Sequence, residues 1–296
     1  MGRIMHRFRH SGLLVESAMA LPEWSAFAVK DEGACDVRIV MADAQSIETG
    51  DGNAAMEEGA VRFAIKGIGA WEMVGGQTIR VVPDARAGPA ELRLFTLGSA
   101  WSAIGLQRGH AVWHGSAVTR NGCTLMICGP QGAGKSTLAA AMIAKGWTLV
   151  ADDLARIEVP RGHAARIYPS ATRLKLWSDA VERLGWQDRI LHRDYFRADK
   201  FHCEAGGVGI EPLPLSAIVV LEEAATLSAE RLTGHAAVTG AFSAALYRPD
   251  QLDALKAWPV QTALAATICA AAPVYRLTRP RTPEGLAQSC ARLDLL

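Results

Sequence analysis

A short glycine-rich segment constrains the fold of this chain more than any other part of its sequence. Residues 129–137 match the G-x-x-x-x-G-K-[ST] pattern of a phosphate-binding loop. An apolar run of strand length, residues 124–128, precedes the loop, and a run of strong helix formers, residues 138–145, follows it. In this order of strand, loop and helix, the loop amides and the helix N-terminus can bind a polyphosphate. The segment therefore predicts an α/β fold with a P-loop (Walker A) core.

Each residue type of the loop has a separate task in binding a polyphosphate. Glycines allow the backbone to turn its N–H groups toward the phosphates. The Lys135 ammonium would neutralise the terminal phosphates, and the Ser136 hydroxyl could bind Mg²⁺. The residues predicted to bind the nucleotide phosphates are Gly129, Pro130, Gln131, Gly132, Ala133, Gly134, Lys135, Ser136 and Thr137.

Composition and charge exclude several classes of protein. The chain has 296 residues, of which 50% are hydrophobic, and its 31 basic and 30 acidic residues include no basic run. We therefore expect a sizeable core and neither nucleic acid nor a membrane as a partner. The longest apolar stretch, residues 262–272, is too short to span a bilayer, and no signal peptide is expected. The six cysteines have no metal-binding spacing, which favours a cytoplasmic protein with reduced thiols.

The pattern of the sequence changes near residue 105. Residues 1–105 are predicted to form a β-rich α+β domain of unassigned role, because residues 12–83 alternate between short strands and turns. Residues 106–296 are predicted to form the P-loop domain, because strands and helices alternate from Ala111 onward. The other predicted elements are strands at 37–40, 61–65, 78–82 and 274–277, a helix at 89–107, and a terminal helix with Thr282 as its cap.

Two adjacent acids, Asp152 and Asp153, end the first apolar run after the loop helix. An acid at a strand end beside a phosphate loop is well placed to bind Mg²⁺. Successive side chains at a strand end point in different directions, so one acid could face Mg²⁺ and the other an attacking hydroxyl. A rival pair, Glu222 and Glu223, follows the later apolar run 218–221.

A histidine precedes the loop in the segment Trp113-His114-Gly115 and could contact a phosphate or the paired acids. Together with the loop and Asp152-Asp153, His114-Gly115 resembles the catalytic domain of HPr kinase/phosphorylase in order and spacing. The chain is more similar still to the HPr-kinase-related serine kinases found with lasso-peptide biosynthesis genes. That similarity rests on the segments 108–117, 168–177 and 199–200, within a resemblance that covers about residues 90–296.

The resemblance implies a P-loop kinase core of HPr-kinase type that transfers the γ-phosphoryl group of ATP to a serine hydroxyl. Lys135 would hold the phosphates, and Asp152 would accept the proton of the serine. Ser136 and Asp153 would hold Mg²⁺ together with Glu204. His114 would orient the acids or stabilise the group in transfer. An assignment in which Asp152 and Asp153 exchange roles remains open.

The sequence departs from the pattern of the family at two places. The signature Glu-x-Arg-Gly-x-Gly-Ile appears as residues 204–210 with Gly206 in place of the arginine, which puts the reverse phosphorylase reaction in doubt. The family's arginine-bearing loop is reduced to residues 247–250, so Arg248 is the candidate for a catalytic, phosphate-facing arginine.

Three functions remain open from the sequence. The favoured one is a kinase whose partner is a peptide or small protein with an acceptor serine, such as a lasso-peptide precursor. The second is an HPr(Ser) kinase/phosphorylase that acts on a folded carrier protein. The third is a P-loop ATPase or regulatory nucleotide-binding module, with Glu222-Glu223 as the hydrolytic acids. A homo-oligomer is possible in each case.

Overall fold

Two units, each with its own β-sheets, make up this mixed α/β structure, a computed structural model that describes residues 4–43, 54–57 and 59–295. The first unit contains residues 1–112 and 248–261, and the second contains residues 113–247 and 262–296. The chain therefore leaves the second unit once and returns to it. The predicted boundary between domains 1–105 and 106–296 stays a prediction, because a division by contacts does not show which segments fold independently.

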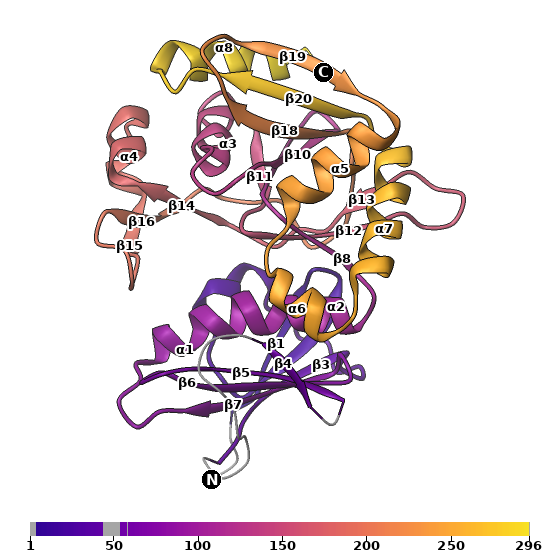
Figure 1. Ribbon diagram of the computed structural model, residues 1–296. Coiled ribbons are helices and arrows are strands. Elements are labelled where there is room, and N and C mark those ends of the chain that lie inside the picture. Colours follow the sequence, from indigo (N-terminus) through magenta and orange to yellow (C-terminus); the bar gives the residue numbers. More distant parts are fainter. Residues whose placement is uncertain (1–3, 44–53, 58, 296) are drawn as a thin grey trace. The chain divides into compact units, whose positions relative to one another are not determined.

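A seven-stranded mixed sheet forms the first unit, in the order β1-β2-β3-β7-β6-β5-β4 (Figure 1). Its strands are β1 (His6–His10), β2 (Leu13–Ser17), β3 (Val37–Met41), β4 (Ala55–Glu57), β5 (Ala60–Ile65), β6 (Gly69–Val74) and β7 (Thr78–Pro83). A 3-10 helix, η1 (Pro22–Phe27), follows β2, and a short helix, α6 (Pro249–Ala254), is added by the later segment. The strands predicted at 37–40, 61–65 and 78–82 are confirmed as parts of β3, β5 and β7.

The predicted helix at 89–107 is present in three pieces. They are α1 (Pro89–Phe95), the π-helical η3 (Thr96–Ala100) and α2 (Trp101–Gln107), and they cover one face of the sheet (Figure 1). The Thr96 hydroxyl donates to the Leu92 carbonyl at 2.8 Å and accepts the Trp71 indole N–H at 2.9 Å. The π-helical turn thus begins at a buried side chain that joins the helix to β6.

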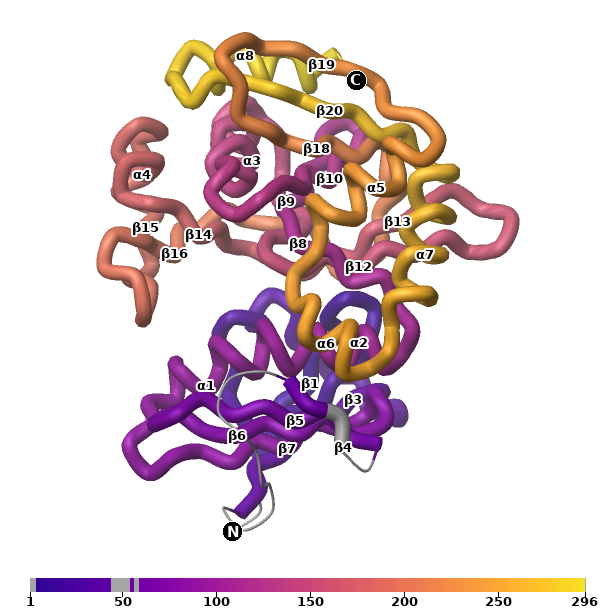
Figure 2. The backbone as a smooth tube through the Cα atoms, in the orientation of Figure 1, coloured from indigo at the N-terminus to yellow at the C-terminus, as the bar shows by residue number. Residues whose placement is uncertain are grey.

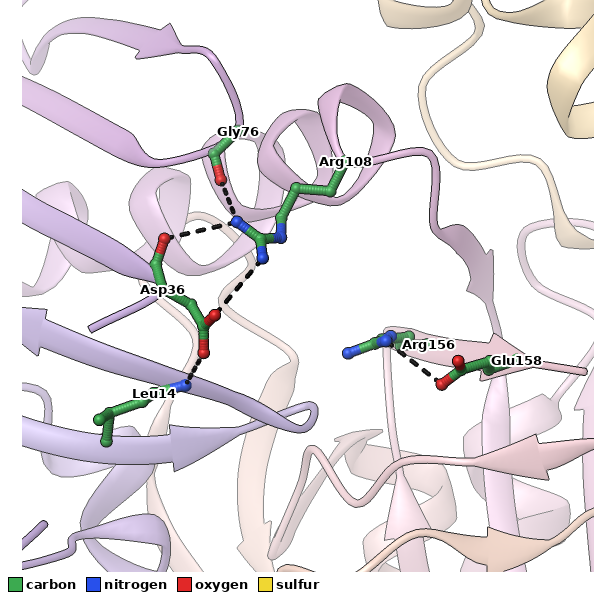
Figure 3. A network of polar contacts seen from close by, with 6 residues as sticks. All are labelled: Leu14, Asp36, Gly76, Arg108, Arg156 and Glu158. Atoms are coloured by element: carbon green, nitrogen blue, oxygen red, sulfur yellow. Dashed lines mark hydrogen bonds and ion pairs between the residues drawn. The ribbon is translucent and has the colours of Figure 1, made fainter. Parts of the chain in front are cut away.

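Arg108 fastens the end of α2 to the sheet (Figure 3). Its Nη1 donates to the Gly76 carbonyl at 3.0 Å and to the Asp36 carbonyl at 3.4 Å, and its Nη2 lies 3.5 Å from Asp36 Oδ1. The other carboxylate oxygen of Asp36 accepts the Leu14 N–H at 2.8 Å. Arg108 therefore has a structural role within the first unit, because both of its terminal nitrogens contact the backbone or the acid Asp36.

Three sheets form the second unit. The largest has the order β11-β9-β10-β18-β20-β19, and β10, β18 and β20 run parallel to one another. Its strands are β9 (Ser116–Arg120), β10 (Cys123–Cys128), β11 (Thr148–Ala151), β18 (Ala217–Glu223), β19 (Ser228–Leu232) and β20 (Val274–Arg279). The second sheet is β17-β13-β12-β8, with β8 (Ala111–His114), β12 (Leu154–Glu158), β13 (Arg166–Ile167) and β17 (Leu213–Pro214). The third is β14-β16-β15, with β14 (Arg173–Trp177), β15 (Ile190–Arg193) and β16 (Lys200–Glu204).

Within the described residues, four helices pack on these sheets: α3 (Lys135–Ile143), α4 (Ser178–Leu184), α5 (Gly234–Ala245) and α8 (Pro283–Leu293). The short η4 (Gln187–Arg189) precedes β15, and α7 (Trp258–Ala271) begins in the later segment of the first unit and continues into the second. Figure 2 shows α4 beside β14, β15 and β16, while α3 and α8 contact each other near the large sheet. The core includes Leu125, Ile127, Leu138, Leu149, Val219 and Leu277, all fully buried.

Two features predicted for the end of the chain are confirmed. The strand expected at 274–277 lies within β20, and α8 begins with Pro283 after Thr282. The Thr282 side chain accepts the Gly285 N–H at 3.1 Å, as an N-cap does. Within the described residues, no helix is long and apolar enough to cross a membrane.

Candidate active site

The glycine-rich segment connects the end of β10 to the start of α3. Gly132 and Gly134 have φ values of 84° and 88°, in the left-handed region that favours glycine. A Cβ on Gly129 would stand 2.6 Å from the Leu221 carbonyl oxygen, so the loop also packs closely on β18. The glycines of the G-x-x-x-x-G-K-[ST] motif are therefore required by the backbone conformation and the close packing of this loop.

The Lys135 side chain folds back over this loop. Its Nζ donates to the carbonyl oxygens of Gly129 at 2.8 Å and of Pro130 at 3.1 Å, and the residue is only 7% exposed. Burial lowers the pKa of the Lys135 ammonium. The ammonium is therefore held at the loop with donor capacity left for an anion, since it has three N–H groups.

The Asp152 carboxylate is held by three hydrogen bonds. Its Oδ1 accepts the hydroxyl of Ser116 at 2.6 Å and that of Ser136 at 3.1 Å, and its Oδ2 accepts the Lys175 N–H at 3.3 Å. Burial, together with the neighbouring charge of Asp153, raises the pKa of Asp152 to about 6. Asp152 is thus fixed against the serine of the glycine-rich loop.

The Asp153 carboxylate forms an ion pair with the Lys175 ammonium. Burial alone would raise the pKa of Asp153, but the charge of Lys175 outweighs it and the pKa is lowered. Asp153 has a φ of 65°, an uncommon value for a residue other than glycine. The Asp153 side chain is 39% exposed, whereas that of Asp152 is held by Ser116 and Ser136.

His114 lies against the backbone of the acid pair. Its Nδ1 is 2.8 Å from the Asp153 carbonyl oxygen, which also accepts the Gly115 N–H at 3.2 Å. The imidazole stacks on the Tyr247 ring, with 5.5 Å between their centroids. Burial lowers the pKa of His114, so the ring is neutral at neutral pH and its Nδ1–H can donate to the carbonyl. His114 therefore fixes the turn on which Asp153 stands.

The structure brings together four of the residues predicted for the site: Ser136, Asp152, Asp153 and His114. It places the Ser136 hydroxyl on Asp152, although the family resemblance pairs Ser136 with Asp153.

Two other predicted site residues, Glu204 and Arg248, have surroundings of their own. Glu204 is exposed at the end of β16, opposite Arg173 in the strand register. Arg248 belongs to the first unit, where its Nε lies 3.9 Å from Asp250 Oδ1. In the part of the chain that the structure describes, no three His, Cys, Asp or Glu side chains form a metal site by themselves. The predicted roles of Glu204 and Arg248 stay predictions.

Sequence reasoning missed two residues of the site, Ser116 and Lys175. Ser116 directly follows His114-Gly115, and a hydroxyl there was a weak signal for a partner of the acids. Lys175 alternates with the buried Leu174 and Leu176 in β14, so its side chain lies on the opposite face of that strand. Nothing in that alternation indicates which acid the lysine meets.

The rival acids of β18 have other contacts. Glu222 Oε1 lies 3.4 Å from Arg276 Nε, and Glu223 Oε2 lies 4.0 Å from Arg281 Nη1. The two glutamate side chains are 44% and 60% exposed. They are therefore partners in surface ion pairs, whereas Asp152 is the acid that contacts the loop serine.

Comparisons with known proteins found a likeness among solved structures. No protein-family model and no curated protein matches the chain. Among solved structures, the HPr(Ser) kinase/phosphatase from Coxiella burnetii matches with a TM-score of 0.33 and 12% sequence identity. The match covers 62% of this chain and 95% of that one.

Gly115 is a position where a side chain would disturb the site. A Cβ there would stand 2.3 Å from the Ile127 carbonyl oxygen and 2.7 Å from Met126 Cε. We expect Gly115→Ala to lower the free energy of unfolding by about 2–3 kcal/mol, because the backbone of β10 must shift. Urea unfolding would measure this, with Gly209→Ala as the control, since a Cβ on Gly209 meets nothing within 4 Å. Equal stability of the two variants would contradict the close packing.

Proposed function

We propose that this protein is an ATP-dependent serine kinase that transfers the γ-phosphoryl group to a serine of a peptide or small protein. The sequence resemblance suggests a lasso-peptide precursor as the substrate. The observation that carries the proposal is the contact of the loop serine Ser136 with Asp152, beside the ion pair of Asp153 and Lys175. This contact joins an anion-binding loop to two carboxylates, which are the groups that phosphoryl transfer requires.

The residues at this point fit a magnesium ion. The Ser136 hydroxyl and Asp152 Oδ1 are hard oxygen donors 3.1 Å apart. Mg²⁺ commonly takes only one or two carboxylates from the protein and completes its shell with phosphate oxygens and water. When bound, the ion would neutralise charge on the phosphates. Glu204, the further ligand expected from the resemblance, makes no contact with either donor in the described residues.

The geometry favours an exchange of the roles that the resemblance implies for the two acids. Asp152 is fixed by three hydrogen bonds and touches Ser136, which suits a metal ligand. Asp153 is partly exposed and pairs with Lys175 through Oδ2, so its Oδ1 is the atom offered to an incoming serine hydroxyl. We therefore assign Asp153 as the proton acceptor. Its low pKa is tolerable because the transition state is loose and the proton can leave late.

Lys135 and Lys175 supply the positive charge in this mechanism. Lys135 would shift its donors from the loop carbonyls to the β- and γ-phosphates. Lys175 holds Asp153 ionised, and its ammonium would also stabilise negative charge on the γ-phosphoryl group. Stabilisation of the charge that develops is the main protein contribution to such reactions.

Removal of the Lys175 charge tests that role. We expect Lys175→Met to lower kcat by about 100-fold with less effect on ATP affinity, because the ammonium acts at the group in transfer. Lys175→Arg keeps the charge and should retain more activity than the methionine variant. Steady-state kinetics with a peptide acceptor would show this, and an unchanged kcat in Lys175→Met would contradict the assignment.

The three candidate functions differ in where phosphate goes. The protein is incubated with labelled ATP and Mg²⁺ together with a serine peptide, with HPr, or with neither. Label on the peptide supports the proposed kinase, whereas label on HPr supports a carrier-protein kinase. Free phosphate without any acceptor supports an ATPase, which the surface ion pairs of Glu222 and Glu223 make the weaker candidate.

A further inference from the structure

Arg279 is a buried cation at the phosphate loop that the proposed chemistry leaves unused. It ends β20 and is 6% exposed. A Cβ on Gly134 would stand 2.6 Å from Arg279 Nη2, so the guanidinium packs directly on the loop residue before Lys135. The side chain of Thr137, in the first turn of α3, lies on the same side of Gly134.

The Arg279 guanidinium has no anionic partner within the described residues. There, its Nη1 makes a long contact of 3.4 Å with the Pro280 carbonyl oxygen, and its buried Nε has no hydrogen-bond partner. Among the residues that the structure describes, no carboxylate forms an ion pair with it. A buried charge of this kind is costly unless an anion compensates it. The loop on which it packs is the part of the unit built to bind anions.

The order of the sheet indicates which part of a nucleotide would come near Arg279. The Asp pair follows β11, on one side of β10, whereas β18 and β20 lie on the other side (Figure 1). Strands β10, β18 and β20 are parallel, so their carboxyl ends share one edge of the sheet. A triphosphate with its γ-phosphoryl group at the acids therefore extends its other end toward β18 and β20. Arg279 lies on that side of the loop.

We propose that Arg279 binds the α-phosphate of the nucleotide, as a charge-assisted donor that acts beside the amides at the start of α3. The inference rests on the ATP site of the proposed function and adds to it a residue that binds the phosphate next to the nucleoside. A guanidinium suits this task, because its planar fork can give two donors to one phosphate group.

A chemical double-mutant cycle tests the contact. Calorimetry measures the Kd of ADP and of both diastereomers of its α-thio analogue for the wild type, Arg279→Met and Arg279→Lys. We expect Arg279→Met to weaken ADP about 10–100-fold. The loss of affinity on replacing one α-oxygen by sulfur should be present in the wild type and shrink in Arg279→Met. Arg279→Lys keeps the charge and should recover part of the affinity.

A matched control lies two residues along the chain. Arg281 is 63% exposed, and Arg281→Met should bind ADP as the wild type does. Wild-type affinity in Arg279→Met would overturn the proposal. So would a sulfur effect of the same size in wild type and Arg279→Met, because Arg279 would then act only by shaping the loop. Serine transfer is measured separately, so a protein that behaves as expected toward ADP but phosphorylates no acceptor refutes the kinase function alone.

Discussion

Asp153→Asn is expected to bind ATP and Mg²⁺ but to transfer phosphate about 10²–10⁴-fold more slowly than the wild type. The amide has nearly the shape of the carboxylate, yet it cannot accept a proton from the serine hydroxyl. Nucleotide binding should persist because Asp152 and Ser136 keep their 3.1 Å contact at the loop. Single-turnover transfer to a serine peptide measures the step, and calorimetry with a non-hydrolysable ATP analogue measures binding.

Asp152→Asn is the control that separates the two acids. The defect of Asp152→Asn should appear as a need for more Mg²⁺ in ATP binding, because the carboxylate beside Ser136 is removed. Transfer should fall as a consequence of that weaker binding, and excess Mg²⁺ should restore part of it. The opposite pattern, normal transfer in Asp153→Asn and a catalytic defect without a metal defect in Asp152→Asn, would restore the roles implied by the family resemblance.

Local sequence signals predicted much of the fold and part of the site. Alternating residues predicted strands such as β5, and a glycine pattern with a following lysine predicted the loop and the helix behind it. These features depend on neighbours in sequence, since φ preferences and side-chain alternation are local properties. The acids at the end of β11 were found because they follow an apolar run directly.

The contacts between distant segments were not predictable in the same way. Lys175 reaches Asp153 because the start of β14 lies beside the end of β11, where the Lys175 N–H also donates to Asp152. A single sequence does not show that two such distant segments lie side by side. The contact of Ser136 with Asp152 depends on tertiary packing, and so does the left-handed backbone at Asp153, which aspartate adopts only in particular settings. The burial of Arg279 against Gly134 likewise needs the order of strands in the sheet.

Lys135→Ala is expected to lose ATP binding by at least about 100-fold, because its ammonium is the one charged group that the loop itself supplies to the phosphates. In the wild type, that ammonium donates hydrogen bonds to the Gly129 and Pro130 carbonyl oxygens, at 2.8 and 3.1 Å. These neutral acceptors hold it less strongly than a polyphosphate can, so exchange of partners favours the nucleotide.

Lys145→Ala provides the matched control for this variant, since Lys145 is an exposed lysine just beyond the other end of α3. It removes the same positive charge from the protein without touching the loop, so its ATP affinity should stay within about 2-fold of the wild type, as expected for screened surface charges. Equal affinity in Lys135→Ala and Lys145→Ala would mean that the glycine-rich loop does not hold a triphosphate. The kinase proposal would then fail, because every other role assigned here depends on a nucleotide held at that loop.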